Sequence, residues 1–106
     1  MADDTQMMKG ILEGCVLALL KNEPLYGYLI VERLQGFGFD AAEATVYPIL
    51  TRLEKKGDLR FEKRPSNLGP PRKYYILTNR GFEALKSFRK SWAATSRIVD
   101  DMLEEV

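Results

Sequence analysis

Apolar side chains recur at helical spacing in the first third of the chain and predict two helices. The first spans about Met7 to Leu20, with its apolar positions three and four apart: Met8, Leu12, Cys15, Val16 and Leu19. Further apolar side chains leave little of this helix polar, so it is buried on more than one side. The second side is covered either by its own chain or by a partner subunit. The second helix, PLYGYLIVERLQG, is predicted to begin at Pro24, end at Gly36 and Gly38, and bury four residues: Leu25, Leu29, Ile30 and Leu34.

A third helix and a hairpin follow directly. The sequence EATVYPILTRLEKKG, beginning at Glu43, turns one face to a core through Val46, Ile49, Leu50 and Leu53. Its start is capped either by Asp40 with Glu43 or by Thr45, and with either start Pro48 does not end the helix. After Gly57 the period changes to two in LRFEKRP and RKYYIL, which predicts two strands joined by a long tip from Ser66 to Pro71. A helix followed by a basic hairpin is the order of a winged helix-turn-helix.

The end of the chain reads as one long helix, capped by Thr78 and running from Asn79 to about Glu105. At 1.5 Å per residue it is roughly 40 Å long, which exceeds the size of such a small domain. A three-four spacing along it selects a mostly apolar seam: Leu85, Phe88, Trp92, Thr95, Val99, Met102 and Val106. Such a seam is typical of a coiled coil, and a second copy of the same helix is its simplest cover.

These elements define the predicted fold class, which is mainly α with a small β-hairpin (α+β). We expect a winged helix-turn-helix DNA-binding domain over residues 1–78 and a coiled-coil-like dimerisation helix over residues 79–106.

Charge is distributed unevenly, although the net charge of the 106 residues is only +1. Residues 1–40 sum to −3, residues 41–78 to +4 and residues 79–106 to zero. The positive charge therefore coincides with the third helix and the hairpin, as a local phosphate-binding surface requires. Several acidic side chains dilute it, so a solvated surface of mixed charge is the alternative.

The composition argues against catalysis and against a membrane span. The chain has no histidine, one cysteine and no glycine-rich phosphate loop, so neither histidine-based catalysis, a metal site nor a cofactor site is expected. The longest apolar run is interrupted by Glu13 and is far short of the ~20 residues that a span needs. With Asp3 and Asp4 where a signal peptide would be basic, and a lone cysteine, we expect a cytoplasmic protein.

The candidate DNA-binding residues are the outward ones of the third helix and the cations of the hairpin. If the third helix enters a major groove, side chains near its start reach base edges, while later cations flank the phosphates. The hairpin then lies beside a minor groove. The predicted set is Tyr26, Ala44, Thr45, Tyr47, Pro48, Thr51, Arg52, Lys55, Arg72, Lys73 and Tyr75. Tyr74 and Tyr75 lie on opposite strand faces, so one should pack on the core.

Three motifs in register, PLYGYLI, ATVYPILTRLEKKG and GPPRKYYILTNRG, resemble the PadR family of bacterial transcriptional regulators, named for control of phenolic acid decarboxylase. Together they cover nearly all of the chain. The resemblance implies a homodimeric repressor on an inverted-repeat operator, with the first helix joining the dimer contact. It also favours a phosphate contact from Tyr26 over simple packing of Tyr26 and Gly27.

Ser91-Trp92 is similar to a pattern in the multidrug-responsive members of that family, where a tryptophan of the last helix stacks flat aromatic ligands in a pore between subunits. This implies a small aromatic effector with four candidate contacts: Cys15, Phe88, Trp92 and Ser96. Alternatively, Trp92 only anchors the dimer. The competing functions are a protein-interaction winged helix and a small-molecule sensor without significant DNA binding.

Overall fold

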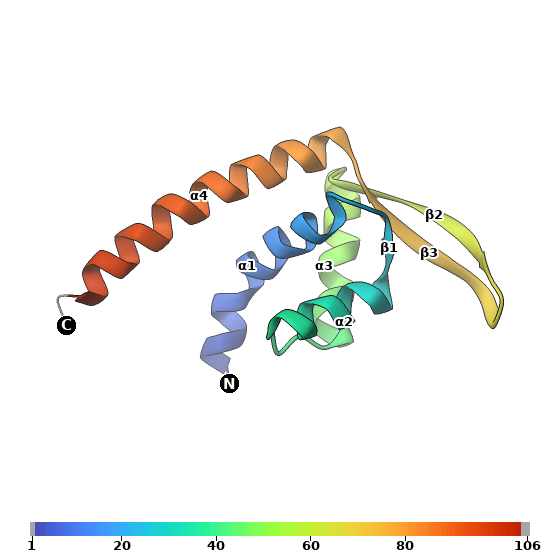
Figure 1. Cartoon of the computed structure of the whole chain (residues 1–106), viewed down its shortest axis with the longest axis horizontal. Helices are drawn as coiled ribbons and strands as arrows, with labels where there is room; N and C mark the ends of the chain where they lie inside the picture. Colours follow the sequence, from blue (N-terminus) through green and yellow to red (C-terminus); the bar gives the residue numbers. More distant parts are fainter. Residues whose placement is uncertain (1, 105–106) are drawn as a thin grey trace.

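Three helices pack at the base of a small antiparallel sheet, and a fourth, long helix extends away from them on the side opposite the sheet (Figure 1). The computed structural model describes the backbone of residues 2–104 and the side chains of residues 7–104. Along the described residues the order is α1 (Ala2–Leu20), β1 (Leu25–Tyr26), α2 (Gly27–Phe37), α3 (Glu43–Lys56), β2 (Leu59–Ser66), β3 (Gly69–Leu77) and α4 (Asn79–Glu104) (Figure 1). This arrangement confirms the α+β class with its hairpin, or wing. The molecule is elongated, at 55 × 31 × 21 Å, because the wing and α4 extend to opposite sides.

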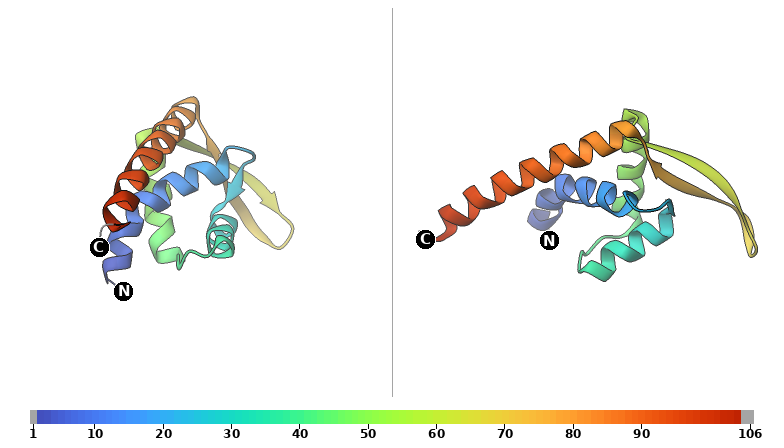
Figure 2. Two further views of the ribbon diagram at one scale, coloured as in Figure 1. Left: turned by 60° about the vertical axis from the view of Figure 1, so that its left-hand side comes forward. Right: turned by 45° about the horizontal axis from the view of Figure 1, so that its top comes forward.

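The hydrophobic core lies between α1, α2, α3 and the base of the sheet. Its most enclosed side chains come from each of these elements: Val16, Leu25, Ile30, Leu34, Val46, Leu50 and Leu53. α1 crosses the middle of this cluster (Figure 2) and is buried through Leu12, Val16, Leu17 and Leu20. Of the two alternatives for the cover of α1, the subunit itself supplies this much, and a contact of α1 with a partner subunit stays a prediction. The helix begins five residues earlier than predicted, because its first turn has no apolar period.

The predicted start of the second helix at Pro24 is wrong. Leu25 and Tyr26 instead form the short strand β1, which pairs antiparallel with Tyr75 and Tyr74 of β3. The sheet order is β1-β3-β2, so β3 is central. α2 then begins at Gly27 and ends at Gly38, whose φ of 115° is the left-handed conformation that glycine adopts without strain.

α3 is capped by neither of the predicted side chains. Its N-cap is Ala42, which offers no side-chain hydrogen bond. Pro48 lies inside the helix, which continues to Lys56 and ends at Gly57 with φ of 87°, so the expectation that Pro48 does not end it is confirmed. The backbone N–H groups at the start of α3 are therefore left without a side-chain cap.

The tip of the wing is shorter than predicted. Ser66 pairs with Gly69, leaving Asn67 and Leu68 as the turn, so the Gly-Pro-Pro segment lies in β3 and not at the tip. The ladder shifts register between Arg64 and Ser66, where two prolines of β3 face one residue of β2. A bulge tolerates proline because no ladder N–H is needed there.

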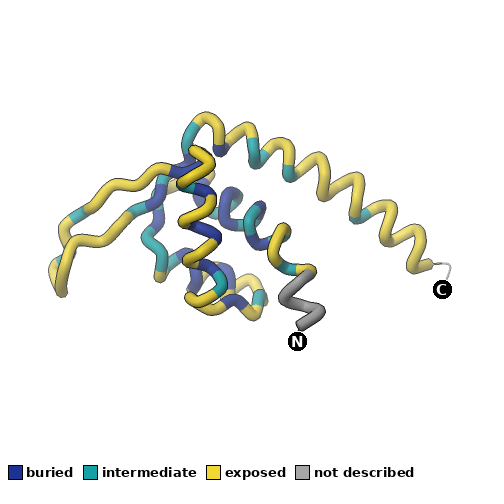
Figure 3. Tube along the Cα trace, turned by 180° about the vertical axis from the view of Figure 1, so that it is seen from behind, coloured by how far each residue is buried: buried dark blue, intermediate teal, exposed yellow. Residues whose placement is uncertain are grey.

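α4 is capped as predicted and is mostly exposed (Figure 3). The amide of Gly81 donates to Oγ1 of Thr78 at 3.0 Å. Only the first part of the predicted seam is covered within the chain: Leu85 packs on the core, and the Phe88 ring lies over Gly14 of α1. The rest of the apolar face is open: Trp92 (49% exposed), Ile98, Val99, Met102 and Leu103. Val106 lies outside the described residues. Among residues 2–104, no helix has both the length and the apolar character that crossing a bilayer demands.

Candidate nucleic-acid interface

The exposed face of α3 carries a continuous row of side chains. Val46, Ile49, Leu50 and Leu53 face the core, so the opposite side of the helix faces solvent. Five of the predicted DNA-binding residues lie on that side and are exposed: Ala44, Tyr47, Pro48, Thr51 and Lys55. Thr45 is half-buried on a flank of the helix. These five residues form the face of α3 that is free to contact a ligand such as DNA.

Tyr47 is held in place by close packing against α2. A Cβ atom at Gly27 would lie 2.9 Å from Cε1 of Tyr47, so only glycine lets the ring approach this closely. Gly27 thus permits the close packing that was the alternative interpretation of this position, while the phosphate contact of Tyr26 stays a prediction. Partial burial raises the pKa of the Tyr47 hydroxyl, and the charges of Glu43 and Tyr75 raise it further. The hydroxyl is therefore protonated at neutral pH and can donate a hydrogen bond.

A cavity of about 470 Å³ lies where α2, α3 and the wing meet. The first turn of α2 opens onto it, and Tyr26, the N-cap of α2, makes no side-chain capping bond. Uncapped N–H groups and the helix dipole favour an anion at such a position. The cavity is lined by tyrosines and two cations: Tyr26, Gly27, Tyr28, Tyr47, Arg72, Lys73 and Tyr75. It therefore offers hydrogen-bond donors and positive charge together.

On one face of the wing, aromatic rings and guanidinium groups alternate. The guanidinium carbon of Arg72 lies 4.4 Å from the centre of the Tyr26 ring, and that of Arg64 lies 4.6 Å from the Tyr74 ring. The two rings meet edge to face at 5.3 Å. Each stack restrains a long cationic side chain, so less conformational entropy is lost when it binds an anion.

The opposite face of the wing joins the core. Tyr75 is only 8% exposed and packs in the core, whereas Tyr74 is half-buried on the outer face. Tyr75 can reach a ligand only through the edge that lines the cavity, so the outward role belongs to Tyr74. Farther out, Nζ of Lys73 lies 4.0 Å above the ring of Phe61 and 3.4 Å from the carboxylate of Glu54 on α3. Lys73 thus ties the wing to α3.

Glu62 reduces the charge of the outer wing. Its carboxylate accepts hydrogen bonds from Arg64 at 3.2 Å and from Arg60 at 3.4 Å. These bonds hold the pKa of Glu62 below its usual value. Within residues 7–104, Arg72 and Lys63 are the wing cations without an ion pair, and of the two only Arg72 lines the cavity.

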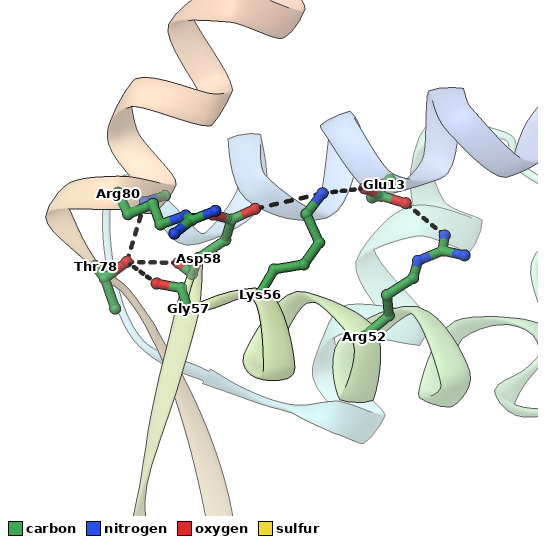
Figure 4. Close-up of polar contacts among 8 residues, drawn as sticks. Glu13, Arg52, Lys56, Gly57, Asp58, Thr78 and Arg80 are labelled. Atoms are coloured by element: carbon green, nitrogen blue, oxygen red, sulfur yellow. Dashed lines mark hydrogen bonds and ion pairs between the residues drawn. The ribbon is translucent and has the colours of Figure 1, made fainter.

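Arg52 does not lie in the predicted row. Its guanidinium donates to a carboxylate oxygen of Glu13 on α1, and Nζ of Lys56 lies 3.2 Å from the other oxygen (Figure 4). Arg52 therefore points toward α1, on the flank of α3 away from the wing. In this structure it is paired with Glu13 of the neighbouring helix, and its role at the phosphate flank stays a prediction.

The predicted effector residues are not gathered at one place within the subunit. Cys15 lines a cavity of about 730 Å³ between α1 and α2, together with Leu19, Phe37 and Phe39 among others. Phe88 covers Gly14, Trp92 is exposed on α4, and Ser96 is half-buried one turn beyond it. Burial raises the pKa of the Cys15 thiol, so the thiol is protonated and weakly nucleophilic at neutral pH.

Sequence reasoning missed three contributors to this surface: Arg64, Tyr74 and Glu13. The basic composition of the hairpin pointed to Arg64 but not to its stacking partner. Alternation along β3 showed that one of its two adjacent tyrosines faces outward without showing which one. Glu13 was visible only as a polar interruption of an apolar helix, and nothing local indicated its partners on α3.

Comparisons with known proteins agree with this geometry. A family model described as the transcriptional regulator PadR-like family matches residues 16–87, which is more than half of the chain. The structure of a PadR-like transcriptional regulator from Bacillus cereus is similar, with 40% identity and a TM-score of 0.83, covering 92% of this chain and 96% of that one.

Two further relatives extend the similarity. A PadR family transcriptional regulator from Eggerthella lenta is 32% identical, with a TM-score of 0.87 over 99% of this chain and 92% of that one. An uncharacterized protein from Lysinibacillus sphaericus is 31% identical over 103 residues, 94% of each chain. The likeness therefore extends beyond the winged domain to most of α4.

Proposed function

Since this chain belongs to the PadR-like family of transcriptional regulators, we propose that it binds an inverted-repeat operator as a homodimer and represses transcription. The observation that carries the proposal is the cavity where the uncapped start of α2, the exposed row of α3 and two wing cations converge. Phosphate contacts position such a domain, and base contacts in the groove give it specificity.

Each part of the surface has a role in this proposal. The row from Ala44 to Lys55 enters the major groove, where Tyr47 and Thr51 face base edges. A backbone phosphate occupies the cavity beside Tyr26 and Arg72. The wing then lies along the adjacent minor groove. In this division residues 1–78 bind DNA and residues 79–106 join two copies.

Dimerisation is supported by the apolar face that α4 leaves uncovered. Trp92 is 49% exposed, Val99 46% and Met102 67%, which is costly on a helix that remains alone in water. A second copy buries this face and sets two recognition helices about one turn of DNA apart. We propose that Trp92, Thr95, Val99 and Met102 form the centre of this contact, and that Leu85 and Phe88 meet it at its edge.

The charges of α4 favour an antiparallel dimer. Four basic and one acidic side chain fall in residues 79–92, whereas one basic and three acidic side chains fall in residues 93–104. Arg89 and Asp100 lie nearly symmetrically about Thr95. At 100° per residue both follow the same flank of the apolar face, whereas the other charges of these two stretches point away from it. An antiparallel pair therefore brings Arg89 and Asp100 together twice, whereas a parallel pair leaves them eleven residues apart along the seam.

We further propose that a small aromatic effector releases the repressor from DNA. The support is the exposed indole of Trp92, which comes close to a dimer axis near Thr95 and is followed by the small residues Ala93 and Ala94. Two such rings facing each other across the axis can stack a flat ligand. The ligand must bind the free dimer more tightly than the DNA-bound dimer to act as an inducer.

Binding to DNA is expected to fall steeply with salt and to depend on the wing. Arg72→Gln/Lys73→Gln removes two phosphate contacts, so the slope of log K against log salt should become shallower by about two. Affinity should fall about 10- to 100-fold on operator and random DNA alike. Fluorescence anisotropy with both DNAs, titrated with salt, measures this. Lys9→Ala/Lys21→Ala, which removes equal charge from α1 and the turn after it, is the control.

Substitutions of the residues proposed to face base edges should affect DNA binding differently from those of the wing. Tyr47→Phe keeps the packing against Gly27 but removes the hydroxyl, so the preference for the operator over random DNA should shrink while the salt slope stays the same. A wild-type protein with a flat salt slope would contradict DNA binding and favour a protein-interaction role. Equal effects of the wing and Tyr47 variants would contradict the division into positioning and reading residues.

Trp92 fluorescence tests the effector. Planar aromatic compounds should quench the emission of Trp92, the only tryptophan, and compete with operator DNA at the same concentrations. Ser96→Leu, one turn after Trp92 on the same face of α4, crowds the proposed site and should abolish the quenching without lowering helix content. No quenching across a varied panel of planar compounds would leave Trp92 as a packing residue of the dimer.

A further inference from the structure

Charged side chains of alternating sign connect α4, α3 and α1. Asp58, only 2% exposed, pairs with Arg80 of α4 at 3.4 Å and with Lys56 of α3 at 3.8 Å. Lys56 in turn pairs with Glu13 of α1, which also binds Arg52 (Figure 4). The chain of contacts thus runs from the start of the long helix to the middle of the helix that faces DNA.

Glu13 neutralises two cations at the edge of the recognition surface. Arg52 and Lys56 are one turn apart on the flank of α3 that faces α1, next to the row formed by Pro48, Thr51 and Lys55. Their side chains are 54% and 47% exposed, so both remain accessible from solvent. Glu13 is less exposed, at 22%, and is fixed between its two partners. The cations are therefore the members of this cluster whose charged groups a further ligand can reach.

The position of Glu13 is set by the packing of α1. Its neighbour Leu12 is buried in the core, and its neighbour Gly14 lies under the Phe88 ring of α4, where a Cβ atom would come within 2.4 Å of that ring. α1 cannot turn or slide against α4 without moving the carboxylate. α4 is also the helix on which the proposed dimer contact and effector site lie.

We propose that Glu13 is a positioning residue that withholds Arg52 from the DNA backbone and thereby limits operator affinity. This rests on the proposed binding of DNA by α3. A phosphate and the Glu13 carboxylate compete for one guanidinium, because both accept hydrogen bonds from its N–H groups. When Arg52 leaves Glu13, it turns to the backbone and adds one phosphate contact.

Removing the charge of Glu13 tests the proposal. Glu13→Gln should bind random DNA about three- to tenfold more tightly at 50 mM salt, and its salt slope should steepen by about 0.9, the value of one phosphate contact. Glu23→Gln is the matched control: it changes net charge equally and removes an exposed pair, with Arg33, that lies away from α3. Circular dichroism and thermal unfolding establish that both variants fold.

A double-mutant cycle identifies the cation. Arg52→Gln should change the slope little when Glu13 is present, but should cancel the whole gain in the Glu13→Gln background. An unchanged slope in Glu13→Gln, or weaker operator binding at the same slope, would overturn the proposal and make the cluster a tether for α3. A loss of slope from Arg52→Gln alone would also overturn it. Wild-type salt dependence reports DNA binding separately, so the two failures are distinguishable.

Discussion

Gly81→Ala is expected to lower the thermal unfolding midpoint by about 10–20 °C, the largest effect of any single methyl group added to this chain. A Cβ atom at Gly81 would lie 2.2 Å from the carbonyl oxygen of Asp58 and 2.6 Å from Cδ1 of Leu77. The first contact is with backbone, which cannot rotate away. That carbonyl oxygen also accepts hydrogen bonds from the amide of Thr78 at 3.1 Å and from its hydroxyl at 3.0 Å. The methyl group therefore forces apart the junction that attaches α4 to the domain.

Two other glycines provide controls for the same substitution. At Gly10 in α1 and Gly36 in α2, an added methyl group would have no neighbouring side chain within 4 Å, so Ala there should stabilise its helix by about 0.5–1 kcal/mol. Because binding between subunits also stabilises the fold, all variants are compared at one protein concentration by differential scanning calorimetry. A midpoint for Gly81→Ala within a few degrees of wild type would mean that α4 can shift at its start without loss.

The helices and the wing were predictable because their apolar periods are long and unbroken. Val46, Ile49, Leu50 and Leu53 fixed which face of α3 is buried, and therefore which face is free. Thr78 caps α4 where a cap was expected, because threonine before a helical pattern satisfies an amide that otherwise has no partner. Local signals were sufficient wherever the partner of a group lies within a few residues.

The errors arose where distant segments decide the local structure. β1 is two residues long and exists because β3 supplies its hydrogen bonds, so Leu25 and Tyr26 carry no strand signal of their own. Pro24 matched the start of a helix, but pairing of the next two residues delayed the helix to Gly27. At the wing, Pro70 and Pro71 were predicted to form the tip. Because Ser66 pairs with Gly69, they lie instead in a bulge of β3.

In the candidate site, too, local patterns predicted some residues correctly, whereas contacts between distant segments could not be predicted. The row on α3 followed from periodicity alone, and Arg72 and Lys73 followed from charge beside a strand. The ion pair of Arg52 could not be predicted, because its partner Glu13 is 39 residues away in sequence. Tyr75 was assigned to DNA although β1 and β3 together turn it inward. Contacts between elements, rather than the pattern within one, decide which cations are available.

Reversing the charge of Arg89 or of Asp100 on α4 should weaken the dimer by about tenfold, and reversing both should restore it. Arg89→Glu, or Asp100→Lys, replaces the attraction between these two residues across an antiparallel pair with repulsion. The contact occurs twice because of the two-fold symmetry, and each copy is worth a fraction of a kcal/mol. Sedimentation velocity over a range of concentrations measures the dissociation constant, and operator binding should weaken in parallel.

The variant with both changes is the decisive comparison, because it has the net charge of the wild type. In an antiparallel dimer it recovers both opposite-charge contacts and should dimerise within about twofold of wild type at low salt. In a parallel dimer Arg89 and Asp100 lie far apart, so single reversals would leave the dissociation constant unchanged. A wild-type monomer would instead contradict the dimer itself. Two-fold pairing of α4 also determines the operator, since it relates the two α3 helices by an axis that only an inverted repeat matches.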